Sequence, residues 1–171
     1  MRRYLAAVMD PWISLLEIHK LMYFMQEAGE PLRLHYQKGI YGPYAENLRH
    51  VLIRIEGHFL TGFGDAEDRP DTQIELDLEA AERAEKFLEG HPETHRRFER
   101  VADLIEGFET PFGMELLATV HWVAAQEGAS TPDKALAGTY AWNDRKRMFT
   151  ERHIRLAWDV LQGKGWLPGV G

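Results

Sequence analysis

The sequence has no cysteine and only two serines among its 171 residues. Without thiols, disulfide bonds and cysteine catalysis are excluded, and this composition is typical of a cytoplasmic protein. Neither Ser14 nor Ser130 lies in the glycine-flanked turn that carries a serine nucleophile. No apolar run approaches the roughly 20 residues of a membrane helix, and Asp10-Pro11 interrupts the N-terminal one too early for a signal peptide. We therefore expect a cytoplasmic protein without a membrane segment.

Motifs for phosphate, cofactor and metal binding are also missing. Gly62-Phe63-Gly64 lacks the third glycine of a dinucleotide-binding loop. His91 and His95 have the spacing of two metal ligands on a helix, but Pro92 separates them and the sequence positions no third ligand. Two solvated histidines at a helix start are the favoured interpretation. We therefore identify no catalytic, cofactor-binding or metal-ligating residue, and we expect no cofactor.

Charge is distributed unevenly along the chain. Residues 65–115 contain 16 acidic and 6 basic side chains, a net charge of −10, whereas the other residues contain 11 acidic and 14 basic ones, a net charge of +3. The net charge of −7 therefore originates in this segment, which we call the acidic middle. Such a segment is usually a solvated surface, although it can also face a basic partner.

Hydrophobic spacing in the first third of the chain predicts a helix that ends near Ala28. Asp10 is placed to cap this helix and Pro11 suits its first turn. Gly29 can adopt the left-handed conformation that follows a helix, and Pro31 blocks any continuation. The buried stripe is expected to comprise Leu15, Ile18, Leu21, Met22, Met25 and Ala28.

Alternating polar and apolar residues predict a small antiparallel sheet with strands near residues 32–37, 58–61 and 72–78. The Tyr41-Gly42-Pro43-Tyr44 segment predicts a turn before the next helix. Its two tyrosines either pack their rings while their hydroxyls stay in water, or present aromatic anchors to a partner.

With 44% hydrophobic residues, the chain can bury one sizeable core, so we expect one domain over residues 1–171. Residues 1–110 form its helix and sheet part, which includes the acidic middle. Residues 111–171 form a C-terminal part of three helices that resembles a helix-turn-helix. The predicted fold is a compact, mostly α-helical α+β domain with a small antiparallel sheet.

The segments KLMYFMQEAGEPL, KGIYGPYAENLRHVL and EGHFLTGFGD resemble the C-terminal domain of DarG, the antitoxin of DarT–DarG toxin–antitoxin systems. A looser KLxYF and YGP pattern is similar to the Panacea antitoxin domains. The resemblance is strong over residues 15–65 and continues to about Leu167. DarG proteins begin with a macrodomain that removes ADP-ribose from DNA, and no macrodomain precedes Met1. From this resemblance we expect the chain to be the toxin-binding half and not an enzyme.

The resemblance implies a partner, DarT, which ADP-ribosylates thymidine in single-stranded DNA. The chain would hold this toxin inactive by binding it, and we expect no direct contact with nucleic acid. An acidic surface can occupy a basic groove in the way that phosphates do, so DNA mimicry is our hypothesis. The predicted partner-binding residues are Tyr41, Tyr44, Asp65, Glu67, Asp68, Asp71, Glu75 and Asp77.

A DNA-binding transcriptional regulator is the alternative. The last three helices have the lengths and short connections of a helix-turn-helix, and five basic residues lie at or near the third: Arg145, Lys146, Arg147, Arg152 and Arg155. The net charge of −7 and the apolar demand of Trp158 and Leu161 oppose this alternative.

Overall fold

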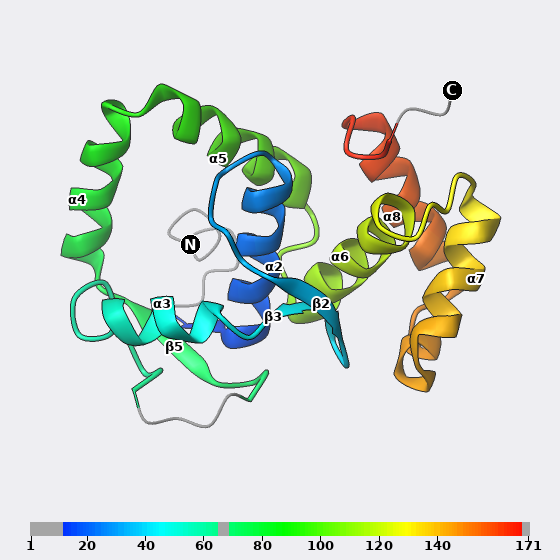
Figure 1. The fold of residues 1–171 in the computed structure, drawn as a ribbon, viewed down its shortest axis with the longest axis horizontal. Coiled ribbons are helices and arrows are strands. Elements are labelled where there is room, and N and C mark those ends of the chain that lie inside the picture. Colours follow the sequence, from blue (N-terminus) through cyan, green and yellow to red (C-terminus); the bar gives the residue numbers. More distant parts are fainter. Residues whose placement is uncertain (1–11, 65–68, 169–171) are drawn as a thin grey trace.

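The computed structural model describes residues 12–64 and 69–168 of the chain. It is a compact, mostly helical α+β fold with small antiparallel sheets, which confirms the predicted fold class. Helix α2 (Leu15–Glu27) lies at the centre. Helices α3 to α5 surround it on one side, and helices α6 to α8 form a group on the other (Figure 1). None of the described helices is both long and apolar enough to cross a bilayer.

Helix α2 begins later than the sequence suggested. Ser14 caps it through a reciprocal capping box with Glu17, and the residues before it form strand β1 (Trp12–Ser14). The predicted cap, Asp10 with Pro11, lies outside the described residues. The end of the helix was predicted well, because Ala28 is the C-cap and Gly29 adopts a φ of 98°.

The buried surface of α2 is wider than the predicted stripe. Tyr23 and Phe24 are fully buried, whereas Met22 and Met25 are only partly buried. The helix needs a wide apolar surface because it packs against both α5 and α6. The α5 helix spans Pro92–Ile105 and α6 spans Pro111–Ala125.

The main sheet has the strand order β1-β5-β4, with both pairs antiparallel. Strands β4 (Leu60–Thr61) and β5 (Gln73–Leu76) confirm two of the three predicted strands. The third strand of the sheet is β1, whose Ile13 pairs with Ile74. The prediction that residues 32–37 belong to this sheet is therefore wrong.

Strand β2 (Tyr36–Gly39) instead pairs with β3 (Gly42–Ala45) in a separate hairpin. The pairing is local because Gly42, with a φ of 95°, closes a tight turn directly after Gly39. A side chain on Gly42 would also place its Cβ 2.9 Å from the Thr119 hydroxyl oxygen. We call residues 36–45 the Tyr41 hairpin.

Short capped helices complete the fold. Helix α3 spans Leu48–Ile55 and α4 spans Leu78–Glu89. The C-terminal part contains α6, α7 (Pro132–Trp142), the 3₁₀ helix η1 (Asp144–Met148) and α8 (Glu151–Gly163). Threonine side chains cap α6, α7 and α8. Helix α6 is buried almost all round, because α2, α7, α8 and the Tyr41 hairpin all pack against it.

Candidate functional site: a cleft beside the Tyr41 hairpin

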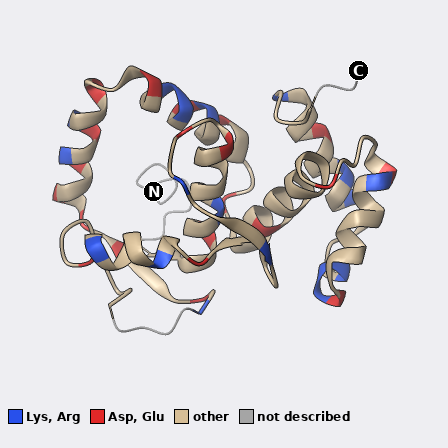
Figure 2. Cartoon of the chain, in the orientation of Figure 1, with Lys and Arg blue, Asp and Glu red and all other residues tan. Residues whose placement is uncertain are grey.

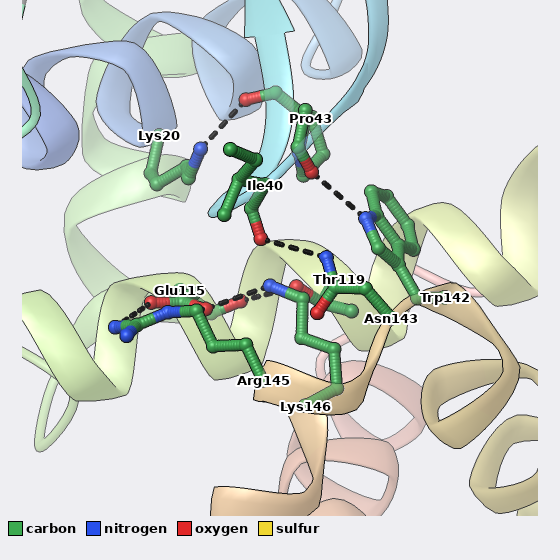
Figure 3. A network of polar contacts seen from close by, with 10 residues as sticks. Lys20, Ile40, Pro43, Glu115, Thr119, Trp142, Asn143, Arg145 and Lys146 are labelled. Atoms are coloured by element: carbon green, nitrogen blue, oxygen red, sulfur yellow. Dashed lines mark hydrogen bonds and ion pairs between the residues drawn. The ribbon is translucent and has the colours of Figure 1, made fainter.

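The Tyr41 hairpin is fixed in place by its backbone carbonyls. The indole Nε1 of Trp142 donates to the Gly39 oxygen at 2.8 Å, and Asn143 Nδ2 donates to the Ile40 oxygen at 3.1 Å. From the other side, Lys20 Nζ donates to the Pro43 oxygen at 2.7 Å (Figure 3). The hairpin therefore forms one rigid wall between α2 and the C-terminal part.

Beside this wall lie two adjoining depressions. The first, which we call the inner cavity, has a volume of about 220 Å³ and a mostly apolar lining that includes Leu16, Lys20, Ile40 and Tyr41. The second, the outer cleft, is about 830 Å³. Its walls include Trp12, Tyr41, Arg69, Asp71, Glu109 and Arg145. Leu16, Tyr41 and Pro70 line both, so the two depressions form one continuous site.

The two predicted tyrosines both reach this site. Tyr44 is half-buried and stacks on His19 with ring centroids 4.6 Å apart. Tyr41 is also half-buried, and the guanidinium of Arg145 lies 4.6 Å from its ring centroid. Both rings therefore have packing roles, and their predicted role as anchors for a partner stays a prediction.

Three of the six predicted acidic residues can be placed, and each has a different structural setting. Asp65, Glu67 and Asp68 lie outside the described residues. Asp71 lines the outer cleft, and Glu75 is exposed on β5. Asp77 caps α4, because its Oδ1 accepts a hydrogen bond from the Ala80 backbone N–H at 2.9 Å. The capping role could have been found from the sequence, since Asp77 directly precedes an amphipathic helix.

Sequence reasoning missed a buried charged cluster behind the inner cavity. Glu115 Oε1 accepts a hydrogen bond from Lys146 Nζ at 2.7 Å, and Glu115 Oε2 accepts one from Arg145 Nη2 at 3.2 Å (Figure 3). Glu115, Lys146 and Lys20 are each at most 2% exposed. A signal was present, because Glu115 interrupts the apolar run of α6 and a carboxylate in such a run needs a buried partner.

Burial lowers the pKa of Lys20 to about 7, and the nearby charge of Lys146 adds to this effect. Burial also lowers the pKa of Lys146, although its contact with Glu115 opposes the shift. Lys20 is therefore an amine that exchanges a proton near neutral pH at the wall of an apolar cavity. Such groups are concentrated at functional sites.

A second buried polar chain connects α2 and α6. The Tyr23 hydroxyl donates to His121 Nδ1 at 2.7 Å, and His121 Nε2 donates to the Trp166 carbonyl oxygen at 3.2 Å. This arrangement requires a neutral imidazole, and burial lowers the pKa of His121 to about 4. The chain is a structural bridge between α2, α6 and the residues after α8.

Four of the five basic residues that suggested DNA binding have acidic partners within the chain. Besides the pairs with Glu115, Arg155 contacts Asp133 at 2.6 Å and Glu151 at 2.8 Å. Arg147 lies 3.6 Å from Asp144, and Arg152 is exposed. Lys146 is completely buried, so it cannot reach a phosphate. These contacts weaken the case for a DNA-binding regulator.

The histidines of the acidic middle also have local partners. His91 Nδ1 donates to the Phe87 carbonyl oxygen at 3.0 Å, and His95 lies 3.6 Å from Glu99. Within residues 12–64 and 69–168, no three His, Asp or Glu residues lie in an arrangement that could hold a metal ion.

Comparison with known proteins identifies clear relatives, although no family model matches the chain. A DNA ADP-ribosyl glycohydrolase of Thermus aquaticus is 45% identical over 89% of the chain. Proteins of the same name from Mycobacterium bovis and Mycobacterium tuberculosis are 41% identical over 94% of it. The chain spans 42% of the Thermus protein and 49% of the mycobacterial ones, so about half the length of the relatives it matches.

These relatives contradict our expectation that the chain is not an enzyme, because proteins that align with about nine-tenths of it are named DNA ADP-ribosyl glycohydrolase. The expectation relied on the resemblance to the toxin-binding half of DarG, without its macrodomain, and on the missing motifs of serine, cysteine, metal and nucleotide chemistry. A search for these motifs does not detect an enzyme that works without them. The matches also agree with the family to which the KLMYF and YGP segments pointed. Over nearly its whole length, the chain is therefore similar to about half of proteins that are named DNA ADP-ribosyl glycohydrolase.

Proposed function

We propose that this chain is a single toxin-binding domain of a DarT–DarG system, which binds and inhibits a DarT-like DNA ADP-ribosyltransferase. The observation that carries the proposal is the 41–45% identity to DNA ADP-ribosyl glycohydrolases over about nine-tenths of the chain. The segments that resemble the DarG C-terminal domain support it further. Lys20 in KLMYF and Tyr41 in YGP line the inner cavity, so these segments build the walls of the site.

The cleft beside the Tyr41 hairpin has the features of a protein-binding surface. Trp12 is 41% exposed on its wall, and Ile40 is 65% exposed at the tip of the hairpin. Together with Tyr41, they provide large apolar side chains on a rigid support. Such anchors supply most of the binding energy in many protein interfaces.

The acidic middle supports a contribution from electrostatic attraction. Asp71 is exposed in the lining of the outer cleft and Glu75 is exposed on β5, and Asp and Glu residues also recur along α4 (Figure 2). A toxin that binds single-stranded DNA presents a basic groove, and carboxylates can enter that groove in place of phosphates. Mimicry of DNA by this surface is part of the proposal.

Inhibition can be tested with a DarT-like ADP-ribosyltransferase and a thymidine-containing single-stranded oligonucleotide. We expect the chain to stop modification of the oligonucleotide once it is equimolar with the enzyme, and to form a stable complex in calorimetry. Full modification in the presence of excess folded chain, with no heat of binding, would refute the proposal.

The two parts of the surface can be separated by variants. Neutralising Asp71 and Glu75 as Asn and Gln, together with Asp65, Glu67 and Asp68, should slow association roughly tenfold at low salt and flatten its salt dependence. Asp159→Asn, an exposed change on α8 outside the lining of both depressions, is the control. Tyr41→Ala should instead accelerate dissociation. Unchanged association of the multiply neutralised variant would refute mimicry and leave binding through the aromatic cleft.

A second candidate function is the activity in the relatives' name, removal of ADP-ribose from DNA. The observation that favours it in this chain is Lys20, whose pKa of about 7 would allow it to act in proton transfer. The test is release of ADP-ribose from an ADP-ribosylated oligonucleotide by the purified chain. Turnover that Lys20→Met abolishes would support this candidate, and turnover unchanged in that variant would remove Lys20 from the chemistry.

A further inference from the structure

The buried charges behind the inner cavity do not balance. Lys20 and Lys146 are two buried amines, and Glu115 is the carboxylate that the structure pairs with Lys146. Glu115 also pairs with Arg145, whose side chain is 43% exposed. Both Glu115 oxygens are engaged, because Oε1 accepts hydrogen bonds from Lys146 Nζ and Arg145 Nε, and Oε2 accepts one from Arg145 Nη2. Within the described residues, the Lys20 amine has a single hydrogen-bond partner, the Pro43 carbonyl oxygen.

An ammonium group that has lost its water needs a negative partner, because a carbonyl dipole replaces only part of the hydration energy. The other carboxylate beside this part of α2 is already engaged, since Glu17 bonds Ser14 in the helix cap. The depressed pKa of Lys20 agrees with a missing counter-charge. The position of Lys20 next to a cavity suggests where that charge comes from.

The amine end of Lys20 lies at the wall of the inner cavity. A Cβ atom built on Gly42 would be 3.5 Å from Lys20 Cε and 3.7 Å from Nζ, and both residues line the cavity. Figure 3 shows the Ile40 side chain, another part of the lining, beside the amine. Glycine is required at this position, because a side chain on Gly42 would clash with Thr119 and press on the end of Lys20.

We propose that the inner cavity binds a carboxylate that is carried on a small apolar or aromatic body. The carboxylate pairs with Lys20, and the body packs against Leu16, Ile40 and Tyr41. The size fits this class of ligand, because a dry cavity of about 150 Å³ holds benzene and this one measures about 220 Å³. A free aromatic acid and the C-terminal residue of a peptide share this chemistry.

Binding should be linked to protons. The charged and titratable groups around Lys20 are His19 on its own helix, Tyr41 and Tyr44 on the hairpin, Glu115 on α6, and Arg145 with Lys146 on η1. A carboxylate favours the ammonium form of Lys20. The affinity should therefore be highest below pH 7 and fall up to tenfold for each pH unit above it.

The experiment uses phenylacetate as the acid and benzyl alcohol as a neutral probe with the same ring. Isotope-labelled lysine reports the titration of Lys20 by NMR, and calorimetry gives the affinities. We expect phenylacetate to bind at pH 6 at least tenfold tighter than benzyl alcohol and to raise the pKa of Lys20 by one unit or more. N-acetylphenylalanine and its amide form the second arm. Preference for this acid over phenylacetate identifies a peptide C-terminus as the ligand.

Three variants complete the design. Lys20→Met should abolish the preference for the acids, whereas the matched control Lys86→Met, on exposed α4, should not change it. Ile40→Glu at the exposed hairpin tip places a carboxylate beside the cavity without touching the core, so it should raise the pKa of Lys20 and exclude phenylacetate. Equal affinity for acid and neutral probes, or a Lys20 titration that no acid shifts, would overturn the proposal.

Discussion

Two buried polar clusters connect α2 with α6, and they differ in how well their groups are matched. In the Tyr23–His121–Trp166 chain, each donor meets an acceptor and no group is charged. In the Lys20–Glu115–Lys146 cluster, cations outnumber the carboxylate. Both are buried, and each has one side chain on α2 and one on α6: Tyr23 and His121 in the first, Lys20 and Glu115 in the second. The difference indicates that the first cluster only supports the fold, whereas the second keeps charge available for another molecule.

The largest expected effect on stability comes from a substitution in the Lys20–Glu115–Lys146 cluster. Glu115→Gln removes the carboxylate and leaves Lys146 as a buried cation without a counter-charge, which should cost roughly 3–5 kcal/mol of unfolding free energy. Adding Lys146→Met should recover most of the loss. Urea melts of both variants measure this. A small effect of Glu115→Gln alone would mean that Lys146 does not depend on Glu115 for its counter-charge, so the contrast between the two clusters would not hold.

The next effect is the pH dependence caused by Lys20. Its folded pKa of about 7 lies below the unfolded value, so the unfolded chain binds more protons between these values and stability rises with pH. From pH 7 to pH 10 the gain should be roughly 3 kcal/mol. The measurement is the difference between the wild type and Lys20→Met in urea melts at both pH values. If the free energies of unfolding of the wild type and Lys20→Met change in parallel with pH, the lowered pKa assigned to Lys20 is wrong.

The Tyr23–His121–Trp166 cluster should instead make the free energy of unfolding depend on pH in the acidic range. The folded pKa of His121, about 4, also lies below the unfolded value, so its contribution is present above pH 6.5 and is lost as the pH falls toward 4. The loss between pH 7 and pH 5 should be about 2 kcal/mol. His121→Gln cannot titrate and should reduce this slope. A slope that the substitution leaves unchanged must come from other groups.

The smallest effect is expected from Tyr23→Phe. The change removes the hydroxyl that donates to His121 Nδ1 and leaves a buried acceptor without a partner, at a cost of about 1–2 kcal/mol. The NMR titration of Lys20 should not move, because the two clusters are separate. A shifted Lys20 pKa would show that they are coupled.

The sequence predicted the features that depend on neighbouring residues. Gly29 sets the end of α2 through local geometry, and this end was placed correctly. Strand β1 was missed because its pairing joins Ile13 to Ile74, far away in the sequence. The alternation near residue 32 was real, but the glycines of the hairpin gave β2 a nearer partner.

The candidate site was predicted only in part, for the same reason. Tyr41 was found because an aromatic residue next to a glycine-proline pair is a local signal. The predicted turn over residues 41–44 was misplaced, because Gly42 and Pro43 begin β3 and the turn lies at residues 40–41. Lys20 is on an apolar helix and its role depends on where α6 and η1 place Glu115 and Lys146, which no local pattern describes. The single carboxylate in the apolar run of α6 was the available hint.

The hydrogen bonds from Trp142 and Asn143 to the Tyr41 hairpin mean that substitutions far away in the sequence can affect the candidate site. A substitution at Trp142 lies a hundred positions from the hairpin in the gene, yet it would loosen the wall against which a ligand rests. Variation in the last third of the chain can therefore retune recognition while every contact residue stays the same. Two homologous chains can therefore come to differ in what they bind through substitutions at positions that do not contact the ligand.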